Sequence, residues 1–465
     1  KKEVEKRKIW QRILLITHES PSWLLFASAI GSNADQAKII RGSDSDFIKN
    51  AEVRELSFIP LPHNHDYELD FHRPFIDEVK IVCDCLPRRS VAEAGGGEMR
   101  RIEDVFDVWF ESGSMPYSEP SFPADFIAEG LDQTRGWFYS LLVLGVGLFE
   151  KSPYKNVIVN GLILAEDGQK MSKRLNNYPD LNLTINKYGA DAIRFYLLSS
   201  PAVRAEDFSF SERGLGEVMR RVIMRLKNVL AFYQLYDTKE EFNFDLKAKP
   251  VLLDTWLTSR LNELNMALAS ALDNYELDQV SKPIDQFVDD LSTWFLRRSR
   301  ERFKSDNIME RATVVRATRH ILITLAKLIA PIMPFTAEEI FQALRTSSDA
   351  ESVHLTAWPE VGRVDNNLLT QMSEVRKIVS LGLEARAKAG VKVRQPLQIL
   401  KINSQGQSLK PAKDCPCELL DLIKDEVNVK EIIFVEKLEK EVELDLKITP
   451  ELKLEGEARD LMRAL

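Results

Sequence analysis

The sequence predicts a multidomain α/β plus α chain that ends in a small α+β domain. Three observations predict it. The apolar run at 157–159 is typical of a buried parallel strand, and it follows apolar residues at helical spacing over 137–148. From 208 to about 344 the apolar residues recur at helical spacing with few strand signals. After a further helical stretch at 374–389, alternating apolar residues at 427–433 predict short strands.

Residues 1–60 come first and carry no motif that indicates a function. Within them, the run from Trp23 to Phe26 predicts a buried strand, and the polar stretch from Gly42 to Asp46 predicts a turn. We leave this segment unassigned.

Two cysteines follow in a short region, residues 61–102. Cys83 and Cys85 would share one face of a strand. A structural zinc site usually needs four ligands, commonly from paired CxxC units. The other candidate ligands would have to be brought close by the fold, and they are His63, His65, Cys415 and Cys417. We expect reduced cysteines, no zinc and no other metal held by side chains.

The α/β region, 103–205, places polar residues where strands end. One strand gives way to the helix that carries Trp137, and the residues at this point are Glu129, Gly130, Asp132 and Gln133. The strand at 157–159 ends at Asn160. Ligands of α/β sheets bind at the carboxyl ends of parallel strands, so we expect a binding site here.

The helical region covers 206–358. Its apolar residues at helical spacing include Trp256, Leu261, Leu264 and Leu268, followed by Phe287, Leu291, Trp294 and Phe295. We expect the last four to face the core. Pro331 and Pro334 should bend or end a helix. The tail, 359–465, reads as a helix followed by short strands.

Composition indicates the kind of protein. The 465 residues have room for about three domains, and four cysteines without regular spacing favour a reducing compartment such as the cytoplasm. The apolar runs are too short to span a bilayer, and no signal-peptide pattern is visible. A net charge of −8 argues against indiscriminate nucleic-acid binding. We expect a cytoplasmic monomer that does not bind membranes.

The most informative motif is the polar loop Lys170-Met171-Ser172-Lys173-Arg174. Two lysines three residues apart could close over a triphosphate and stabilise the charge that grows in a transition state. The turn at Asp167-Gly168 reverses the chain just before the loop. The alternative is a solvated surface loop.

Two upstream blocks argue against that alternative. They are Asp107-Val108-Trp109-Phe110-Glu111-Ser112-Gly113-Ser114-Met115-Pro116-Tyr117 and Glu129-Gly130-Leu131-Asp132-Gln133-Thr134-Arg135-Gly136-Trp137-Phe138. With the lysine loop they resemble, in order and at about the same spacing, the class I aminoacyl-tRNA synthetases, whose KMSKS signature has serine where this chain has Arg174. Within that family, the blocks are similar to the isoleucine enzymes rather than to the valine or leucine ones.

The resemblance implies a domain layout. Residues 61–102 would be a remnant of a connective, ribbon-like region, and 103–205 the carboxy-terminal half of a Rossmann-type nucleotide-binding catalytic domain. Residues 206–358 would form a helix-bundle anticodon-binding domain, and 359–465 a carboxy-terminal α+β domain.

The resemblance also implies a reaction. Lys170 and Lys173 would hold the phosphates of ATP, accompanied by Mg²⁺, while the carboxylate of L-isoleucine attacks the α-phosphorus. Isoleucyl-adenylate and pyrophosphate result, and the isoleucyl group then passes to tRNA(Ile).

Further residues would bind the adenylate and the amino acid. The family's contacts with adenylate and ammonium group fall on Glu129, Gly130, Asp132, Gln133 and Asn160, where carboxylate and amide acceptors suit the ligand. Trp109 and Trp137 would wall the isoleucine side chain. The alternatives are that Asp132 caps a helix and that the tryptophans are ordinary core residues.

The same family uses a HIGH-type histidine motif, and this sequence contains no HxGH spacing. Nor does any part resemble an editing domain, which such an enzyme needs because one methylene discriminates only weakly. We therefore expect these residues alone to be catalytically incomplete.

Contact with tRNA is expected from the helical region, where cations gather in two stretches. One stretch holds Arg213, Arg220, Arg221, Arg225 and Lys227, and the other is the denser of the two. Its residues are Arg297, Arg298, Arg300, Arg302 and Lys304, which could neutralise phosphates. The alternative for each residue is ordinary solvation near a helix carboxy terminus.

Two rival functions remain to be weighed. A synthetase-derived tRNA-binding or scaffolding protein without catalysis would explain the missing histidines, but it would not need the lysine loop. A P-loop or dinucleotide enzyme is excluded because GxxxxGK and GxGxxG are both absent.

Overall fold

The computed structural model describes residues 16–17, 19–29, 37–39, 48–49, 52–56, 62, 64, 70–78, 81–82, 98–99, 102, 104, 107–117, 122–172, 174–237, 251–404, 409 and 417–464. The chain divides into two compact units, Lys1–Asp107 and Val108–Leu465. Several residues considered above lie outside the described residues. They are Gly42 to Asp46, His63, His65, Cys83, Cys85, Lys173 and Cys415, and the side chain of Cys417 is not described.

The first unit contains the helix α2 (Glu19–Ala29), a short helical turn η1 (Phe75–Glu78) and the antiparallel pair β1 (Ile81–Val82) and β2 (Glu98–Met99). The predicted strand from Trp23 to Phe26 is wrong, because these residues belong to α2. A short apolar run fits either structure. The helical conformation is stabilised here by the burial of Ala27 and Ala29 and by a hydrogen bond of 2.7 Å from the Trp23 indole to the carbonyl of Ala37.

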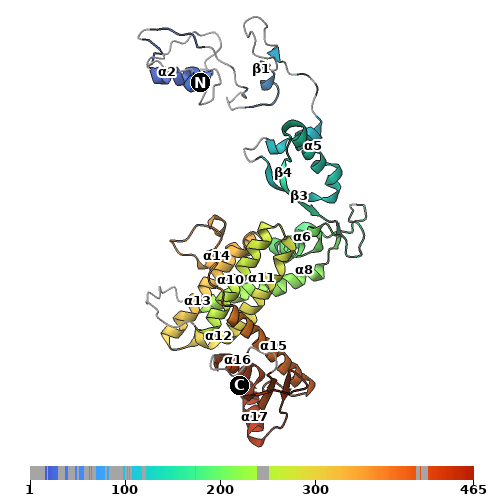
Figure 1. Ribbon diagram of the computed structural model, residues 1–465, viewed down its shortest axis with the longest axis vertical. Coiled ribbons are helices and arrows are strands. Elements are labelled where there is room, and N and C mark those ends of the chain that lie inside the picture. Colours follow the sequence, from blue (N-terminus) through green and yellow to red (C-terminus); the bar gives the residue numbers. More distant parts are fainter. Residues whose placement is uncertain are drawn as a thin grey trace. The chain divides into compact units, whose positions relative to one another are not determined.

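The second unit begins with the helix α4 (Val108–Gly113) and a βαβ unit. Strand β3 (Ala124–Gly130) leads through a 3₁₀ turn, η3 (Leu131–Arg135), into helix α5 (Trp137–Phe149), and β4 (Tyr154–Asn160) returns parallel to β3 (Figure 1). Ile127, Phe138 and Leu141 are buried between the sheet and the helix. The predicted strand and helix are therefore confirmed.

The burial of this strand was predicted wrongly. Among the described residues this sheet has two strands, packed against α5, and Val157 is 43% exposed. Helix α5 is apolar on its other side too, where Tyr139, Leu142, Val143 and Val146 are between 41% and 63% exposed. A helix that is apolar all round normally has a covering partner on each face.

A second parallel pair links the βαβ unit to the helices. Strand β5 (Ile163–Leu164) pairs with β6 (Phe208–Ser209), and helices α6 (Leu181–Tyr188) and α7 (Ala190–Leu198) and the turn η4 (Pro201–Arg204) lie between them in sequence. Gly161, just after β4, donates its N–H to the carbonyl of Ala202 at 2.7 Å. A Cβ at Gly161 would collide with the backbone of Glu206, so only glycine permits this approach.

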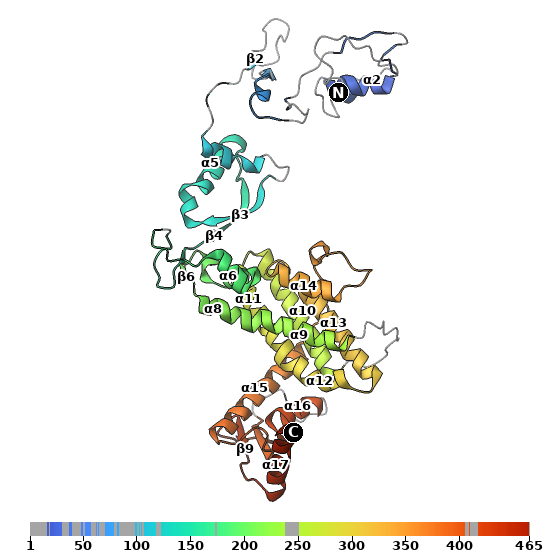
Figure 2. The same ribbon diagram turned by 180° about the vertical axis from the view of Figure 1, so that it is seen from behind.

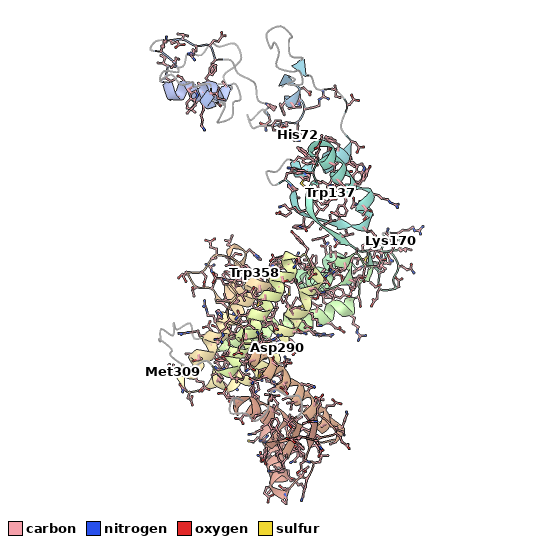
Figure 3. The ribbon with its side chains drawn as sticks, viewed as in Figure 1. His72, Trp137, Lys170, Asp290, Met309 and Trp358 are labelled. Carbon is pink, nitrogen blue, oxygen red and sulfur yellow. The ribbon has the colours of Figure 1, made fainter. Side chains whose placement is uncertain are left out.

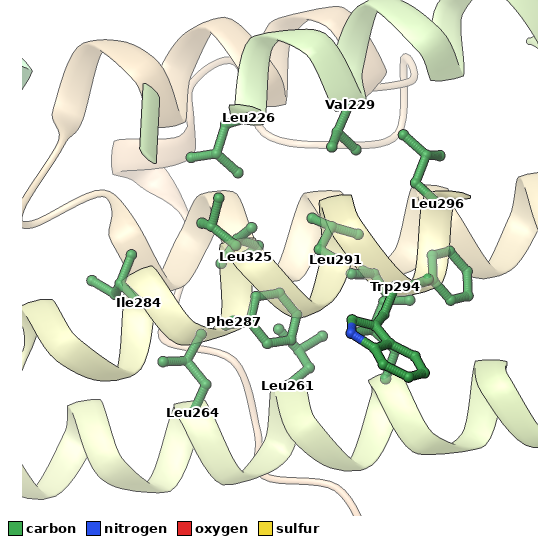
Figure 4. Close-up of a cluster of buried hydrophobic side chains, with 14 of the residues drawn as sticks. Leu226, Val229, Leu261, Leu264, Ile284, Phe287, Leu291, Trp294, Leu296 and Leu325 are labelled. Atoms are coloured by element: carbon green, nitrogen blue, oxygen red, sulfur yellow. The ribbon is translucent and has the colours of Figure 1, made fainter. Parts of the chain in front are cut away.

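The helical part shares one large core. Its elements are α8 (Glu212–Val218), η5 (Met219–Ile223), α9 (Met224–Tyr236), α10 (Leu252–Asp273), η6 (Leu277–Gln279), α11 (Ser281–Asp289), η7 (Asp290–Leu296), α12 (Arg297–Lys304), α13 (Ile308–Ile329) and α14 (Pro334–Leu344). Side chains from α9, α10, α11, η7 and α13 meet in this core (Figure 4). All eight of these helically spaced apolar residues are buried. Helix α13 ends at Ile329, just before Pro331, as predicted. Pro334 was predicted wrongly, because it begins α14 instead of bending or ending a helix, and the first helical position needs no N–H from proline.

The tail forms a small α+β domain, shown from behind in Figure 2. It consists of α15 (Asn366–Lys388), β7 (Leu397–Asn403), α16 (Cys417–Val427), β8 (Val429–Val435), β9 (Val442–Leu444) and α17 (Pro450–Ala464), with the strand order β8-β7-β9. Strand β7 is parallel to β8 and antiparallel to β9. The alternating apolar residues at 427–433 were predicted to form short strands, but Val427 is the last residue of α16 and β8 begins at Val429.

Arg386 joins the helix α15 to the rest of the tail domain through hydrogen bonds. Its guanidinium is fully buried and donates to the backbone carbonyls of Val427, Asn428, Lys392 and Gln395. One side chain thus ties α15 to the turn before β7 and to the start of β8.

In the part of the chain that the structure describes, no helix is long and apolar enough to cross a membrane.

Candidate adenylate-binding site and lysine loop

The ends of β3 and β4 form the edge on which the candidate site is built. Their parallel register sets Glu129 opposite Val159 and Gly130 opposite Asn160. The Glu129 side chain is exposed and has no hydrogen-bond or ion-pair partner among the described residues. The structure therefore brings three of the sequence-predicted residues to one strand-end edge.

Gln133, in the turn η3, caps the start of helix α5 with its side chain. Its Oε1 accepts the backbone N–H of Trp137 at 2.8 Å, and its Nε2 donates to Asp132 Oδ2 at 3.2 Å. A Cβ at Gly136 would lie 2.6 Å from Gln133 Oε1, so the glycine leaves room for this contact. The side chain that caps the helix is thus Gln133 and not Asp132, the residue expected to do so in the alternative reading.

Both tryptophans lie beside the start of α5. The Trp137 indole is half-buried and donates to the carbonyl of Ser112 at 2.9 Å, which ties α4 to α5 (Figure 3). Trp109, on α4, is 50% exposed and lies against Gly136. Trp137 also packs against the small core of Ile127, Phe138 and Leu141. Trp109 consequently has the more accessible ring of the two.

The lysine loop follows β5. Gly168, with φ +79°, donates to the carbonyl of Ala165 at 2.9 Å, and Ala165 donates to the carbonyl of Gln169 at 2.9 Å. The predicted turn at Asp167-Gly168 is confirmed by these bonds. Lys170 then pairs with Leu164 through an isolated antiparallel bridge, and its side chain is exposed (Figure 3). Lys173 lies outside the described residues.

Sequence reasoning missed Asn177. Its side-chain amide bonds to the backbone of both Lys170 and Ser172, and so joins the two ends of the described part of the loop. The available signal was an asparagine shortly after a polar loop, since short amide side chains favour local bonds to backbone.

The cationic helix α12 differs from the predicted solvent-facing surface. Arg297 and Arg298 bond to Glu426 and Asp425 of α16 at 2.7 Å, and Arg302 bonds to Asp254 of α10. Lys304 lies 4.0 Å from Glu301, and Arg300 is exposed without a partner among the described residues. Three of the five predicted cations are therefore already neutralised within the chain.

A polar cavity of about 1590 Å³ lies between η5, η7, α10 and α15. Asp290 in its wall is 1% exposed and bonds to Arg260 at 2.8 Å and to Arg376, whose guanidinium lies 5.4 Å from the Trp294 ring centroid. Burial raises the pKa of Asp290, and both arginines oppose that shift. Most of the arginines and carboxylates of this wall are paired with each other, so most of the charge in the cavity is compensated within the chain. Among the described residues, no three histidine, cysteine, aspartate or glutamate side chains come close enough to hold a metal ion.

Comparison with known proteins identifies the family of the chain. Residues 62–209 match the family of tRNA synthetases class I (I, L, M and V), and residues 254–401 match the anticodon-binding domain of tRNA ligase. The chain belongs to the class I aminoacyl-tRNA synthetase family.

Its relatives within that family are isoleucine–tRNA ligases. The chain is 40% identical to the one from Chlamydia trachomatis over 417 residues, which is 85% of this chain and 38% of the relative. It is 43% identical to that of Protochlamydia amoebophila over 402 residues, 82% of this chain and 36% of the relative. A solved complex of Agrobacterium radiobacter LeuRS with tRNA and LeuAMS is 17% identical, with a TM-score of 0.44, over 62% of this chain and 36% of that one. The chain thus spans less than half the length of these proteins.

Proposed function

We propose that this chain forms part of an enzyme that ligates L-isoleucine to tRNA(Ile) through isoleucyl-adenylate. One observation carries the proposal: in a chain 40% identical to isoleucine–tRNA ligases, two parallel strands end together at Glu129, Gly130 and Asn160, and the lysine loop follows the next strand, β5. The βαβ unit would be the second half of a Rossmann-type nucleotide-binding sheet. Ligands of such sheets bind at this edge.

The residues fit the chemistry of adenylate formation. The exposed ammonium of Lys170 can neutralise charge on the triphosphate, which would arrive as the magnesium complex of ATP. Carboxylates of Glu129 and Asp132 are acceptors for the α-ammonium group of isoleucine. Gln133 would act through its Nε2 donors, because its Oε1 already accepts from Trp137. The exposed ring of Trp109 would line the isoleucine side chain, with Trp137 behind it. Lys173 completes the proposed set of phosphate ligands.

The test is isoleucine-dependent exchange of pyrophosphate into ATP by the natural polypeptide that contains these residues. Isoleucine should support exchange better than valine or leucine, and Lys170→Ala should suppress it. Binding of tRNA without exchange by that polypeptide would instead favour the alternative function, a synthetase-derived tRNA-binding or scaffolding protein.

For the tRNA we propose the helical domain as the binding surface, with Arg300 and Lys304 as its phosphate contacts on α12. Both are on the helix whose opposite side packs into the core, and neither forms a close ion pair among the described residues. Arg297, Arg298 and Arg302 could contribute only by exchanging their present carboxylate partners for phosphates.

Charge reversal tests the two proposed phosphate contacts of α12 against exposed lysines elsewhere in the chain. Arg300→Glu with Lys304→Glu should weaken tRNA binding and reduce its salt dependence by about two phosphate contacts. The double change Lys447→Glu with Lys453→Glu, at exposed lysines of the tail, alters the net charge equally and should leave the salt slope unchanged. Equal loss of affinity in both double variants would mean that only net charge matters, and α12 would not be the surface.

A further inference from the structure

One side chain closes the described part of the lysine loop. Asn177 Oδ1 accepts the backbone N–H of Ser172 at 2.9 Å, and Asn177 Nδ2 donates to the carbonyl of Lys170 at 3.3 Å. A single amide therefore bonds to the backbone on both sides of Met171. The side-chain amide of asparagine offers a donor and an acceptor on two neighbouring atoms, whereas ionised aspartate offers acceptors alone.

The rest of the loop is held from two other directions. The Lys170 backbone forms the bridge to Leu164, and Met171 is half-buried and packs against the main hydrophobic core. Ser172 Oγ accepts the N–H of Leu175 at 3.2 Å. The backbone from Lys170 to Ser172 is therefore held by β5, by the hydrophobic core and by Asn177. The Lys170 side chain remains exposed to solvent.

We propose that Asn177 is a positioning residue for adenylate formation: its amide sets the backbone from which Lys170 reaches the triphosphate. The inference rests on the function proposed above. A catalytic cation acts only if it stands where charge develops, and a misplacement of about 1 Å can cost a factor of about 100 in rate. Asn177 needs no contact with substrate to have this effect.

The backbone part of the proposal is tested on the chain as it stands, by amide hydrogen exchange at Ser172. Asn177→Ala removes the acceptor, so the Ser172 N–H should exchange faster. Asn177→Asp keeps an acceptor for Ser172 and loses the donor to Lys170, so Ser172 should stay protected. Asn186→Ala, on the exposed surface of α6, is the matched control and should change neither. Unchanged exchange at Ser172 in Asn177→Ala, with a normal thermal unfolding curve, would overturn the proposal.

The catalytic part is tested in the natural polypeptide that contains these residues. Asn177→Ala should lower kcat of pyrophosphate exchange by about 10- to 100-fold with little change in KM for isoleucine, Asn177→Asp should fall between, and Asn186→Ala should match the parent. A higher KM for isoleucine with unchanged kcat would contradict a positioning role. If the parent polypeptide shows no exchange at all, the proposed function fails, whereas the Ser172 measurement still decides whether Asn177 holds the loop.

Discussion

Arg302 and Asp254 form a two-pronged ion pair in which Nη1 and Nη2 of the arginine each donate to one carboxylate oxygen at 2.7 Å. The side chains are only 11% and 7% exposed, so the pair lies largely out of water. It joins α12 to α10, two helices separated by η6, α11 and η7 in sequence. A residue type that the sequence offers as a phosphate ligand serves here as a link between helices.

Breaking this pair should therefore destabilise the helical domain. Arg302→Ala leaves the largely buried carboxylate of Asp254 without its cationic partner, which should lower the unfolding free energy by about 3–5 kcal/mol. Arg302→Lys should recover only part of it, because an ammonium cannot make the parallel pair of bonds. Urea unfolding measures the effect, with Arg300→Ala as the exposed control. Equal unfolding free energies for Arg302→Ala and Arg300→Ala would show that the pair contributes nothing.

A second stability prediction concerns Arg386. Burial lowers the pKa of its guanidinium to about 10, so it is still a cation at neutral pH while donating to four carbonyls. Arg386→Met should leave those carbonyls without donors and cost about 3 kcal/mol or more. The loss should appear in the tail, as faster amide exchange in β7 and β8, before it appears in α10 or α13. Uniform protection in Arg386→Met would contradict this role.

The chain of residues 1–465, purified by itself, should not catalyse isoleucine-dependent pyrophosphate exchange. Its sequence has lysines for the triphosphate but no HxGH motif for the same transition state. Exchange above the blank, with its dependence on isoleucine shown by omitting that amino acid, would refute the expectation of incompleteness.

In a polypeptide with the complete site, Lys170→Ala or Lys173→Ala should slow adenylate formation by roughly 10²- to 10³-fold, as expected for the loss of one transition-state donor. Affinity for isoleucine should hardly change, because neither lysine faces the amino acid in the proposed arrangement. Single-turnover kinetics separates the two effects. An unaffected rate in the double variant would reduce the loop to a surface turn.

Zinc is the subject of the last prediction. Protein prepared in metal-free buffer should contain no stoichiometric zinc, because Cys83 and Cys85 supply only half of the ligands that a structural site usually needs. Elemental analysis before and after dialysis against a chelator decides the matter. One zinc per chain that survives dialysis would mean that the fold supplies two further ligands.

Much of the site was predictable because its pieces are local in sequence. Strand β3, the polar turn at Gly130 to Gln133 and helix α5 follow one another directly, and a parallel return strand must end at the same edge as the first. The helical core was predictable for a similar reason, since Phe287, Leu291, Trp294 and Phe295 repeat at the helical period whatever they pack against.

What the sequence determined by itself was thus the set of local elements, the lysine loop and the family to which both point. Tertiary structure alone decided which atoms are free to act. It assigned Gln133 rather than Asp132 to the helix start, paired Arg302 with Asp254, and brought Asn177 back to Lys170. The physical reason is that helical or strand periodicity reports which face of an element is apolar, whereas the partner of a polar side chain depends on distances between segments, which no spacing along the chain encodes.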